Sequence, residues 1–263
     1  MKFIKMNGLG NDYVFIDCRN EEVSDPCMLA RKVSDRHKGI GSDGLVLMLP
    51  DQECDLGMRI FNADGSEAET CGNACRCIAR YAWESGWCRK PEIRLMTAAG
   101  LTLLKPDIDH GKFCSASVDM GQVRDIQGPM KVNAYESAFT GFYVNIGNPH
   151  FVIFGNPVSD ALLLKYGPLI ENSDQLAMTV NVEFATAVSE NRLRVRVWER
   201  GSGITRACGS GACAVFAAAR QKGLCGNSAE IELDGGTLNI SFEEETGHII
   251  QSGPAEVNFY GEL

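Results

Sequence analysis

Two cysteine–glycine pairs carry the clearest chemical signal in this 263-residue chain. Cys71 precedes Gly72, Cys208 precedes Gly209, and the two cysteines are 137 positions apart. Each pair stands where a helix is expected to begin, and a thiol at a helix N-terminus loses its proton more easily than a free one. The unpaired backbone N–H groups of such a terminus also favour a bound carboxylate. Two opposed thiols suit the removal of a proton from one face of a carbon and delivery of a proton to the other. The pattern therefore predicts a racemase or epimerase that uses two bases.

The same offset of 137 recurs at other places along the chain. Gly10-Asn11 is repeated as Gly147-Asn148, and each pair precedes an apolar run. Gly86 and Gly223, which follow the two expected helices, have this offset too. A shared offset at four separated places indicates a duplicated unit, so the two cysteines are expected at equivalent positions of two similar domains.

The duplicated unit predicts a strand, a loop, a buried helix and a β-hairpin in each half. Apolar spacing predicts helices over 71–85 and 208–222, each ended by a glycine. The expected fold is α/β (α+β), with two pseudo-symmetric domains, each a mainly antiparallel sheet wrapped around a central helix. We expect domain boundaries at 1–117 and 118–253, with the last strand, 254–263, returning to the first domain. The active site is expected in the interdomain cleft.

Composition narrows the classes of partner. The net charge of −9 argues against nucleic acid and against an anionic membrane surface, which both attract basic proteins. No apolar run reaches membrane-spanning length, and the N-terminus has no secretory apolar region. These features predict a cytoplasmic protein whose eleven cysteines are reduced.

Other chemistry for the cysteines stays open on the residues alone. A nucleophilic Cys-His enzyme would use His150 or His37 as the base. A metal site would draw on Cys71, Cys75 and Cys77, although the chain has no second Cys-x-x-Cys or His pair at zinc spacing. The remaining cysteines are expected to be packing residues, as are Cys75 and Cys77; they are Cys18, Cys27, Cys54, Cys88, Cys114, Cys213 and Cys225.

Seven motifs spread over nearly the whole chain resemble those of the diaminopimelate epimerase family. These epimerases need no cofactor and belong to the route to lysine and peptidoglycan precursors. The motifs are Met6-Asn7-Gly8-Leu9-Gly10-Asn11-Asp12-Tyr13, Arg59-Ile60-Phe61-Asn62-Ala63-Asp64-Gly65-Ser66-Glu67, Cys71-Gly72-Asn73, Gly147-Asn148-Pro149-His150, Asn181-Val182-Glu183-Phe184, Trp198-Glu199-Arg200-Gly201 and Ala207-Cys208-Gly209-Ser210-Gly211-Ala212-Cys213.

The resemblance implies that LL- and meso-diaminopimelate are interconverted without pyridoxal phosphate, a metal or another cofactor. It implies that Cys71 and Cys208 are the catalytic thiols and that His150 tunes one of them. It further implies a homodimer that takes a small-molecule amino acid as substrate. The substrate-binding residues that it implies are Asn11, Asn62, Gly72, Asn73, Asn148, Asn181, Glu199, Arg200, Gly209 and Ser210. Arg200 suits a bidentate pair with the distal carboxylate, and Glu199 suits an ammonium group.

The chain departs from the family pattern at two places. Ala74 and Cys75 stand where Gly-Ala is usual after the first Cys-Gly-Asn, and Ile204 stands where a glutamate is usual. A racemase of the same fold for another amino acid, such as histidine, therefore remains an alternative. A non-catalytic amino-acid binding protein is a third reading. If the two catalytic sulfurs face each other closely, oxidation is expected to join Cys71 to Cys208.

Overall fold

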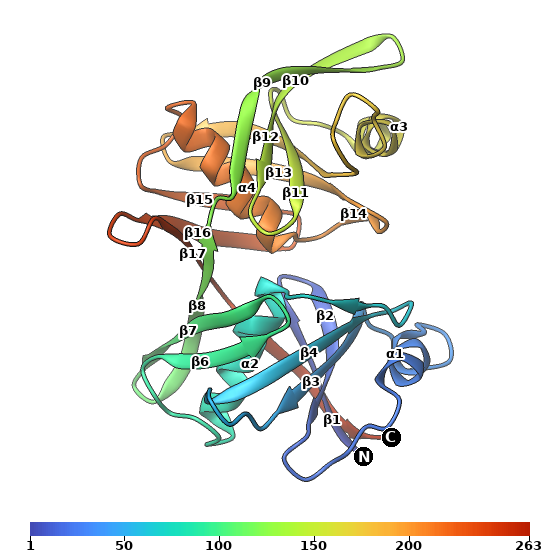
Figure 1. Ribbon diagram of the computed structural model, residues 1–263, viewed down its shortest axis with the longest axis vertical. Helices are drawn as coiled ribbons and strands as arrows, with labels where there is room; N and C mark the ends of the chain where they lie inside the picture. Colours follow the sequence, from blue (N-terminus) through green and yellow to red (C-terminus); the bar gives the residue numbers. More distant parts are fainter. The chain divides into compact units, whose positions relative to one another are not determined.

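The computed structural model describes residues 1–263 as eighteen strands and four helices, an α/β fold with a mixed and mainly antiparallel sheet (Figure 1). The chain divides into two compact units, one of residues 1–119 with 252–263 and the other of residues 120–251. The chain passes between them twice, within β8 (Lys112–Gln122) and within β17 (His248–Gly253).

The first unit follows an order that the second unit repeats with one exception. Its elements are β1 (Lys2–Gly8), β2 (Asn11–Asp17), α1 (Pro26–Ser34), β3 (Gly44–Leu49), β4 (Leu56–Asn62), β5 (Glu67–Ala68), α2 (Gly72–Glu84), β6 (Ile93–Thr97), β7 (Gly100–Asp109), the start of β8, and β18 (Glu256–Glu262). The C-terminal strand β18 pairs antiparallel with β1, so the chain ends in the unit in which it began.

The second unit has corresponding elements. They are β9 (Asp125–Ala134), β10 (Ser137–Asn145), β11 (Pro149–Phe154), α3 (Asp160–Glu171), β12 (Asn181–Ser189), β13 (Arg192–Glu199), β14 (Gly203–Thr205), α4 (Gly209–Gln221), β15 (Ser228–Leu233), β16 (Gly236–Glu243) and β17. Their order is the same as in the first unit, except that β9, which pairs with β10 as β18 pairs with β1, comes first rather than last.

Strand pairing follows the same scheme in both units. In the first, β2 pairs parallel with β3 and places Tyr13 opposite Gly44. In the second, β11 pairs parallel with β12 and places His150 opposite Asn181. Both partners in the second unit lie 137 positions after their counterparts. The duplication that the cysteine spacing predicted therefore extends to the register of the sheets.

The helices α2 and α4 begin one residue after the two cysteines. Cys71 is the N-cap of α2 and Cys208 is the N-cap of α4, and both have extended backbone angles. The helices predicted from Cys71 and from Cys208 are thus confirmed. Residues 72–79 of α2 are all buried, and α4 is buried along most of its length. Burial of this kind keeps most of the first turn of each helix out of water, so that its unpaired N–H groups act strongly on a nearby charge.

The helices α1 and α3 complete a separate core in each unit. Val33 of α1 packs with Val14 and Leu45 of the first sheet. Leu163 of α3 packs with Phe151 and Val182 of the second. Each buried side chain of this size contributes about 1.5–3 kcal/mol through its removal from water. These cores hold the strands from which the functional side chains project.

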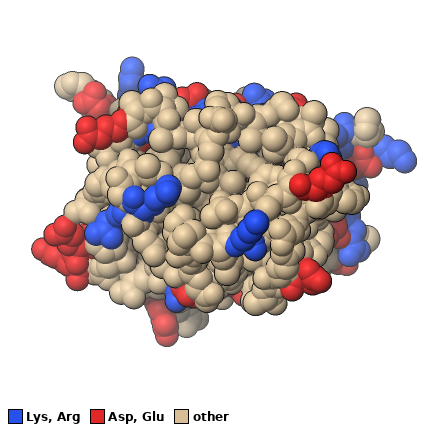
Figure 2. Space-filling view, turned by 90° about the horizontal axis from the view of Figure 1, so that it is seen from above, with Lys and Arg blue, Asp and Glu red and all other residues tan.

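No helix of the structure is long and apolar enough to cross a membrane. On the face seen in Figure 2, basic and acidic side chains are interspersed among uncharged ones, with no continuous basic patch.

Candidate active site

Cys71 lies at the start of α2 beside two polar groups of β2. The Tyr13 hydroxyl is 3.8 Å from Cys71 Sγ, and Asn11 Oδ1 is 3.6 Å from it. The phenol can donate to a thiolate, and the amide oxygen can accept from a thiol. Burial, and then the charge of Cys71, raises the pKa of Tyr13 well above its usual value. The phenol therefore stays protonated and remains a donor whichever form the thiol takes.

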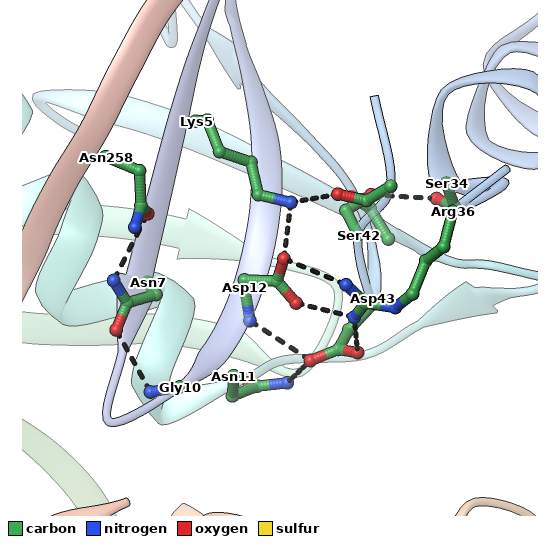
Figure 3. A network of polar contacts seen from close by, with 12 residues as sticks. Lys5, Asn7, Gly10, Asn11, Asp12, Ser34, Arg36, Ser42, Asp43 and Asn258 are labelled. Carbon is green, nitrogen blue, oxygen red and sulfur yellow. Dashed lines mark hydrogen bonds and ion pairs between the residues drawn. The ribbon is translucent and has the colours of Figure 1, made fainter. Parts of the chain in front are cut away.

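Asn11 is held in place by a charged network that reaches it from the loop before β3 (Figure 3). Its amide nitrogen donates to Asp43 Oδ2 over 2.8 Å, and Asp43 in turn pairs with Arg36 over 2.9 Å. Arg36 also pairs with Asp12, which contacts Lys5. Partial burial would raise the pKa of Asp12, but hydrogen bonds from Arg36 and Lys5 outweigh it and lower that pKa. With its nitrogen committed to Asp43, Asn11 must present its oxygen to Cys71.

Asn73 and Arg76 organise the first turn of α2. Asn73 donates to Asn11 Oδ1 over 3.0 Å and accepts from Arg76 over 2.7 Å. Arg76 is fully buried and also donates to Pro254 O over 3.0 Å. The Asn73 side chain is thus used internally, which leaves its backbone N–H as the group that a ligand would meet.

Asn62 has different surroundings. It is exposed at the end of β4, and its amide nitrogen donates to Ser66 Oγ over 3.0 Å within the turn before β5.

Cys208 lies at the start of α4 in a drier setting, with 6% of its surface exposed. Its sulfur accepts from the Gly211 N–H at 3.3 Å and lies 3.6 Å from Ser210 Oγ. Burial, followed by the charges of Glu199 and Glu183, raises the pKa of Cys208 well above its usual value. The contacts with Ser210 and Gly211 act in the opposite direction and do not outweigh these causes.

His150 and Glu183 form a fully buried pair close to Cys208. His150 Nδ1 lies 2.7 Å from Glu183 Oε1, and its Nε2 lies 3.0 Å from Asn148 Oδ1. Glu183 presses against the first turn of α4, because a Cβ at Gly211 would lie only 2.6 Å from Glu183 Oε1. A ring nitrogen of His150, a Glu183 oxygen and the Cys208 sulfur lie within 4.8 Å of one another, which makes this group able to hold a metal ion.

Glu199 and Arg200 extend from the end of β13. Glu199 is half-buried and accepts a hydrogen bond from the Thr205 hydroxyl. Asn181 is buried and uses both ends of its amide, accepting from the Arg200 N–H over 3.0 Å and donating to Pro149 O over 3.1 Å. Asn181 therefore positions the backbone of Arg200, whose guanidinium is exposed and donates to Thr179 O over 3.3 Å.

A side chain at the position after Cys208 would require the buried Gln251 side chain to move. A Cβ at Gly209 would lie 2.8 Å from the Gln251 amide nitrogen. At one departure from the family pattern, Ile204 is half-buried and packs against the apolar core of the second unit. At the other, Ala74 and Cys75 are both fully buried.

The other nine cysteines differ in burial: Cys75, Cys77, Cys88 and Cys213 are buried, Cys18, Cys54 and Cys225 are half-buried, and Cys27 and Cys114 are exposed. Burial raises the pKa of Cys75 and of Cys77 to about 12, so both remain neutral thiols, and neither belongs to the donor cluster that contains Cys208. Cys27 and Cys114 are exposed, so the expectation that they are packing residues was wrong. His37 is also exposed, in the turn after α1, where its N–H donates to Asp35.

Four residues around Cys71 and Cys208 were not predicted as site residues from the sequence: Tyr13, Asp43, Arg76 and Glu183. The offset of 137 pairs Tyr13 with His150, so the repeat carried a signal for Tyr13. Glu183 lies within the motif that begins at Asn181. Asp43 and Arg76 had no comparable signal, because their partners are far away in the sequence.

A family model described as diaminopimelate epimerase matches residues 3–126 and 142–258. A diaminopimelate epimerase of Desulfovibrio desulfuricans is 43% identical over 282 residues, covering 100% of this chain and 98% of the relative. One of Bacteroides thetaiotaomicron is 44% identical over 267 residues, with the same shares of the two chains covered.

Solved structures share the fold at low sequence identity. A PhzF-family phenazine biosynthesis protein of Bacillus anthracis has a TM-score of 0.78 at 13% identity, covering 100% of this chain and 98% of that one. A probable proline racemase of Agrobacterium radiobacter has a TM-score of 0.74 at 15% identity, covering 100% and 92%. At such identities the likeness extends to the fold alone.

Proposed function

This chain belongs to the diaminopimelate epimerase family, and we propose that it interconverts LL- and meso-diaminopimelate by passing the Cα proton between Cys71 and Cys208. The observation that carries this mechanism is the pair of equivalent helix starts, each with a cysteine as its N-cap. A two-base inversion requires one acid-base group for each face of the reacting carbon, and one thiol from each unit would supply them.

The proposed reaction needs one thiolate and one thiol at its start. The thiolate takes the Cα proton and becomes a thiol, while the opposite thiol gives its proton to the other face of the carbanion and becomes a thiolate. The configuration at one carbon is inverted, and the two sulfurs exchange protonation states. The reverse reaction starts from the state in which the forward one ends.

The surroundings of the two sulfurs support an assignment for the resting enzyme. Cys71 has the Tyr13 phenol as a donor, and that phenol stays protonated. Cys208 is buried near Glu183 and Glu199, which raise its pKa. The raised pKa of Cys208 supports the resting thiol there, so that the resting thiolate falls to Cys71. At Cys71 the Tyr13 donor favours the charge and Asn11 Oδ1 opposes it.

The helix termini are the proposed binding site for the reacting carboxylate. The N–H groups of Gly72 and Asn73 open α2, and those of Gly209 and Ser210 open α4. These groups have no partners within their helices, and the helix dipoles favour a negative charge beside them. Their fixed orientation would stabilise the charge that moves onto the carboxylate as the proton leaves.

Recognition of the distal amino-acid end is proposed for side chains outside the helix starts. Arg200 would pair with the distal carboxylate, and Glu199 would bind an ammonium group. Asn181 supports this role by fixing the Arg200 backbone. Asn11, Asn62 and Asn148 would complete substrate binding through amide donors and acceptors.

Purified protein tested with diaminopimelate isomers and a panel of single amino acids will separate this proposal from a racemase of another substrate. We expect inversion of diaminopimelate alone, and loss of that activity in Cys71→Ala and in Cys208→Ala. Full activity of either variant would contradict the two-thiol mechanism. Binding of diaminopimelate without any inversion would favour a binding protein instead.

We also propose a cytoplasmic homodimer. All eleven cysteines are free thiols, which suits a reducing compartment. Sedimentation of the purified protein over a range of concentrations will test the dimer.

A further inference from the structure

Three donor side chains of different chemistry meet beside the first turn of α4. They are His150, Glu183 and Cys208, all buried, each with a donor atom within 4.8 Å of the other two. Imidazole nitrogen, carboxylate oxygen and thiolate sulfur are the three ligand types that proteins use for Zn²⁺. We propose that these residues form a site for one thiophilic divalent cation, with Zn²⁺ as the representative ion.

The spacing of the donors is close to what such an ion needs. A tetrahedral Zn²⁺ ion with bonds of about 2.0–2.3 Å holds its ligand atoms roughly 3.3–3.6 Å apart. Here Nδ1 of His150 and Oε1 of Glu183 are 2.7 Å apart, and no separation among the three donors exceeds 4.8 Å. Movements of about 1 Å in the side chains would therefore reach zinc geometry. Ser210 Oγ, 3.6 Å from the sulfur, or a water molecule would supply a fourth ligand.

Glu183 supplies a second, independent indication of a ligand. The residue is fully buried, and its Oε2 atom has no hydrogen-bond partner. Buried carboxylate oxygens are almost always paired, because their loss of water is otherwise uncompensated. A cation bound between Glu183 and Cys208 would provide the missing partner.

The charges balance on binding. A distance of 2.7 Å between Nδ1 and a carboxylate oxygen requires a proton between them, and the Cys208 thiol carries another. His150 Nε2 keeps its own proton towards Asn148 Oδ1, so the divalent cation would displace the two protons named and leave a neutral imidazole, a carboxylate and a thiolate around it. The buried group would then have no net charge, and two protons would leave per ion bound.

The first unit cannot form the same site. At the positions that correspond to His150 and Glu183 it has Tyr13 and Val46, and only the cysteine is retained. The cation site is thus a property of the Cys208 half alone. Cys71→Ser is therefore a matched control for Cys208→Ser, because Cys71 has the equivalent position in its unit but lacks the other two ligands.

Occupancy would block the sulfur of Cys208. Inhibition by the cation therefore rests on the catalytic role proposed for Cys208, whereas binding rests only on the three donors. The two parts can be measured separately.

Titration of metal-free protein with Co²⁺ tests binding directly, because a thiolate bound to Co²⁺ gives a near-ultraviolet charge-transfer band. We expect one Co²⁺ per chain, displacement by Zn²⁺, and release of two protons per ion. The band should persist in Cys71→Ser and vanish in Cys208→Ser. The affinity should fall roughly 10- to 100-fold or more in Glu183→Gln, which keeps the side-chain shape. Circular dichroism will establish that each variant is folded.

The absence of the band in the wild type, its persistence in Cys208→Ser or its loss in Cys71→Ser would overturn the site. In the activity arm, Zn²⁺ should inhibit epimerisation, and a chelator should restore it. Stoichiometric binding with undiminished activity would support the site while contradicting the role of Cys208. If the wild-type protein epimerises its substrate but binds no cation, the proposed cation site is contradicted and the catalytic role of Cys208 is not.

Discussion

Tyr13 and His150 occupy the same position in the two units, each on a strand paired in parallel with its neighbour and in the same register. Tyr13 brings a phenol to 3.8 Å from Cys71, whereas His150 forms a buried pair with Glu183 near Cys208. Equivalent backbone positions thus carry different polar groups. The consequence is that two similar helix starts hold their cysteines in different electrostatic surroundings.

Removal of the Tyr13 hydroxyl should weaken Cys71 as a thiolate. Because the phenol is a donor that stays protonated, Tyr13→Phe removes a hydrogen bond that favours the charged sulfur. A bond of this kind is worth about 1 kcal/mol, so we expect alkylation of Cys71 at neutral pH to slow roughly fivefold. Mass spectrometry of iodoacetamide-treated protein will measure the rate. Tyr81→Phe is the control, since its phenol bonds Asp17 instead, and equal slowing in both variants would contradict the assignment.

Cys208 should react with alkylating agents only at a higher pH than an ordinary thiol does. Burial and the charges of Glu199 and Glu183 raise the pKa of Cys208, so less of it is thiolate at neutral pH. Glu199→Gln removes one negative charge and should lower that pKa, bringing alkylation of Cys208 to lower pH. Site-resolved alkylation between neutral and alkaline pH will check both points. An unchanged Cys208 profile in Glu199→Gln would show that the carboxylate does not act on the sulfur.

The repeat made much of the fold predictable. The Cys-Gly pairs and the glycines after them were enough to predict where α2 and α4 begin. The helix α3 was not predicted. Gly167 and Pro168 lie within this helix, and both residue types usually interrupt a helix rather than continue it. The strand β9 was also missed, because it lies at the start of the second unit, before the first repeated motif, Gly147-Asn148.

Removal of the buried Arg76 charge should be strongly destabilising. Its guanidinium donates to Asn73 and to Pro254 O, and it is fully buried. Arg76→Met would leave these two acceptors unpaired, and at about 1–3 kcal/mol for each we expect the free energy of unfolding to fall by about 2–6 kcal/mol. Chemical denaturation will measure it. Arg80→Met, one turn later on α2 and partly exposed, should cost about 1 kcal/mol or less. Similar losses in the two variants would contradict the importance of the buried position.

Alkaline pH should destabilise the protein partly through Cys77. Burial raises its pKa to about 12, while an unfolded thiol has a pKa of about 8.5. Between these values the unfolded state has lost a proton that the folded state keeps, so stability falls as pH rises. The contribution is up to about 1.4 kcal/mol per pH unit.

Cys77→Ala should therefore flatten the dependence of unfolding free energy on pH between about 9 and 11. Cys114→Ala, at an exposed position, should leave the pH dependence of the unfolding free energy unchanged. An equal flattening in Cys114→Ala would contradict the role of the buried Cys77 thiol.

Details of the site depended on contacts that no local pattern encodes. Asp43 orients Asn11 across 32 residues, and Arg76 reaches Pro254 across 178. Asn181 was expected to touch the substrate, yet both ends of its amide are used within the protein. Side-chain types and the offset could indicate which positions matter, but the partner of each polar group follows from the paired strands.

The most direct test of the account is the position of deuterium after the first turnovers in heavy water. If Cys71 takes the substrate proton and Cys208 delivers a solvent-derived one, meso-diaminopimelate formed from the LL isomer will carry deuterium at the inverted carbon. The LL isomer that remains will carry none at early conversion. Equal deuterium in recovered substrate and product, or product that keeps the original proton, would contradict a transfer between two thiols.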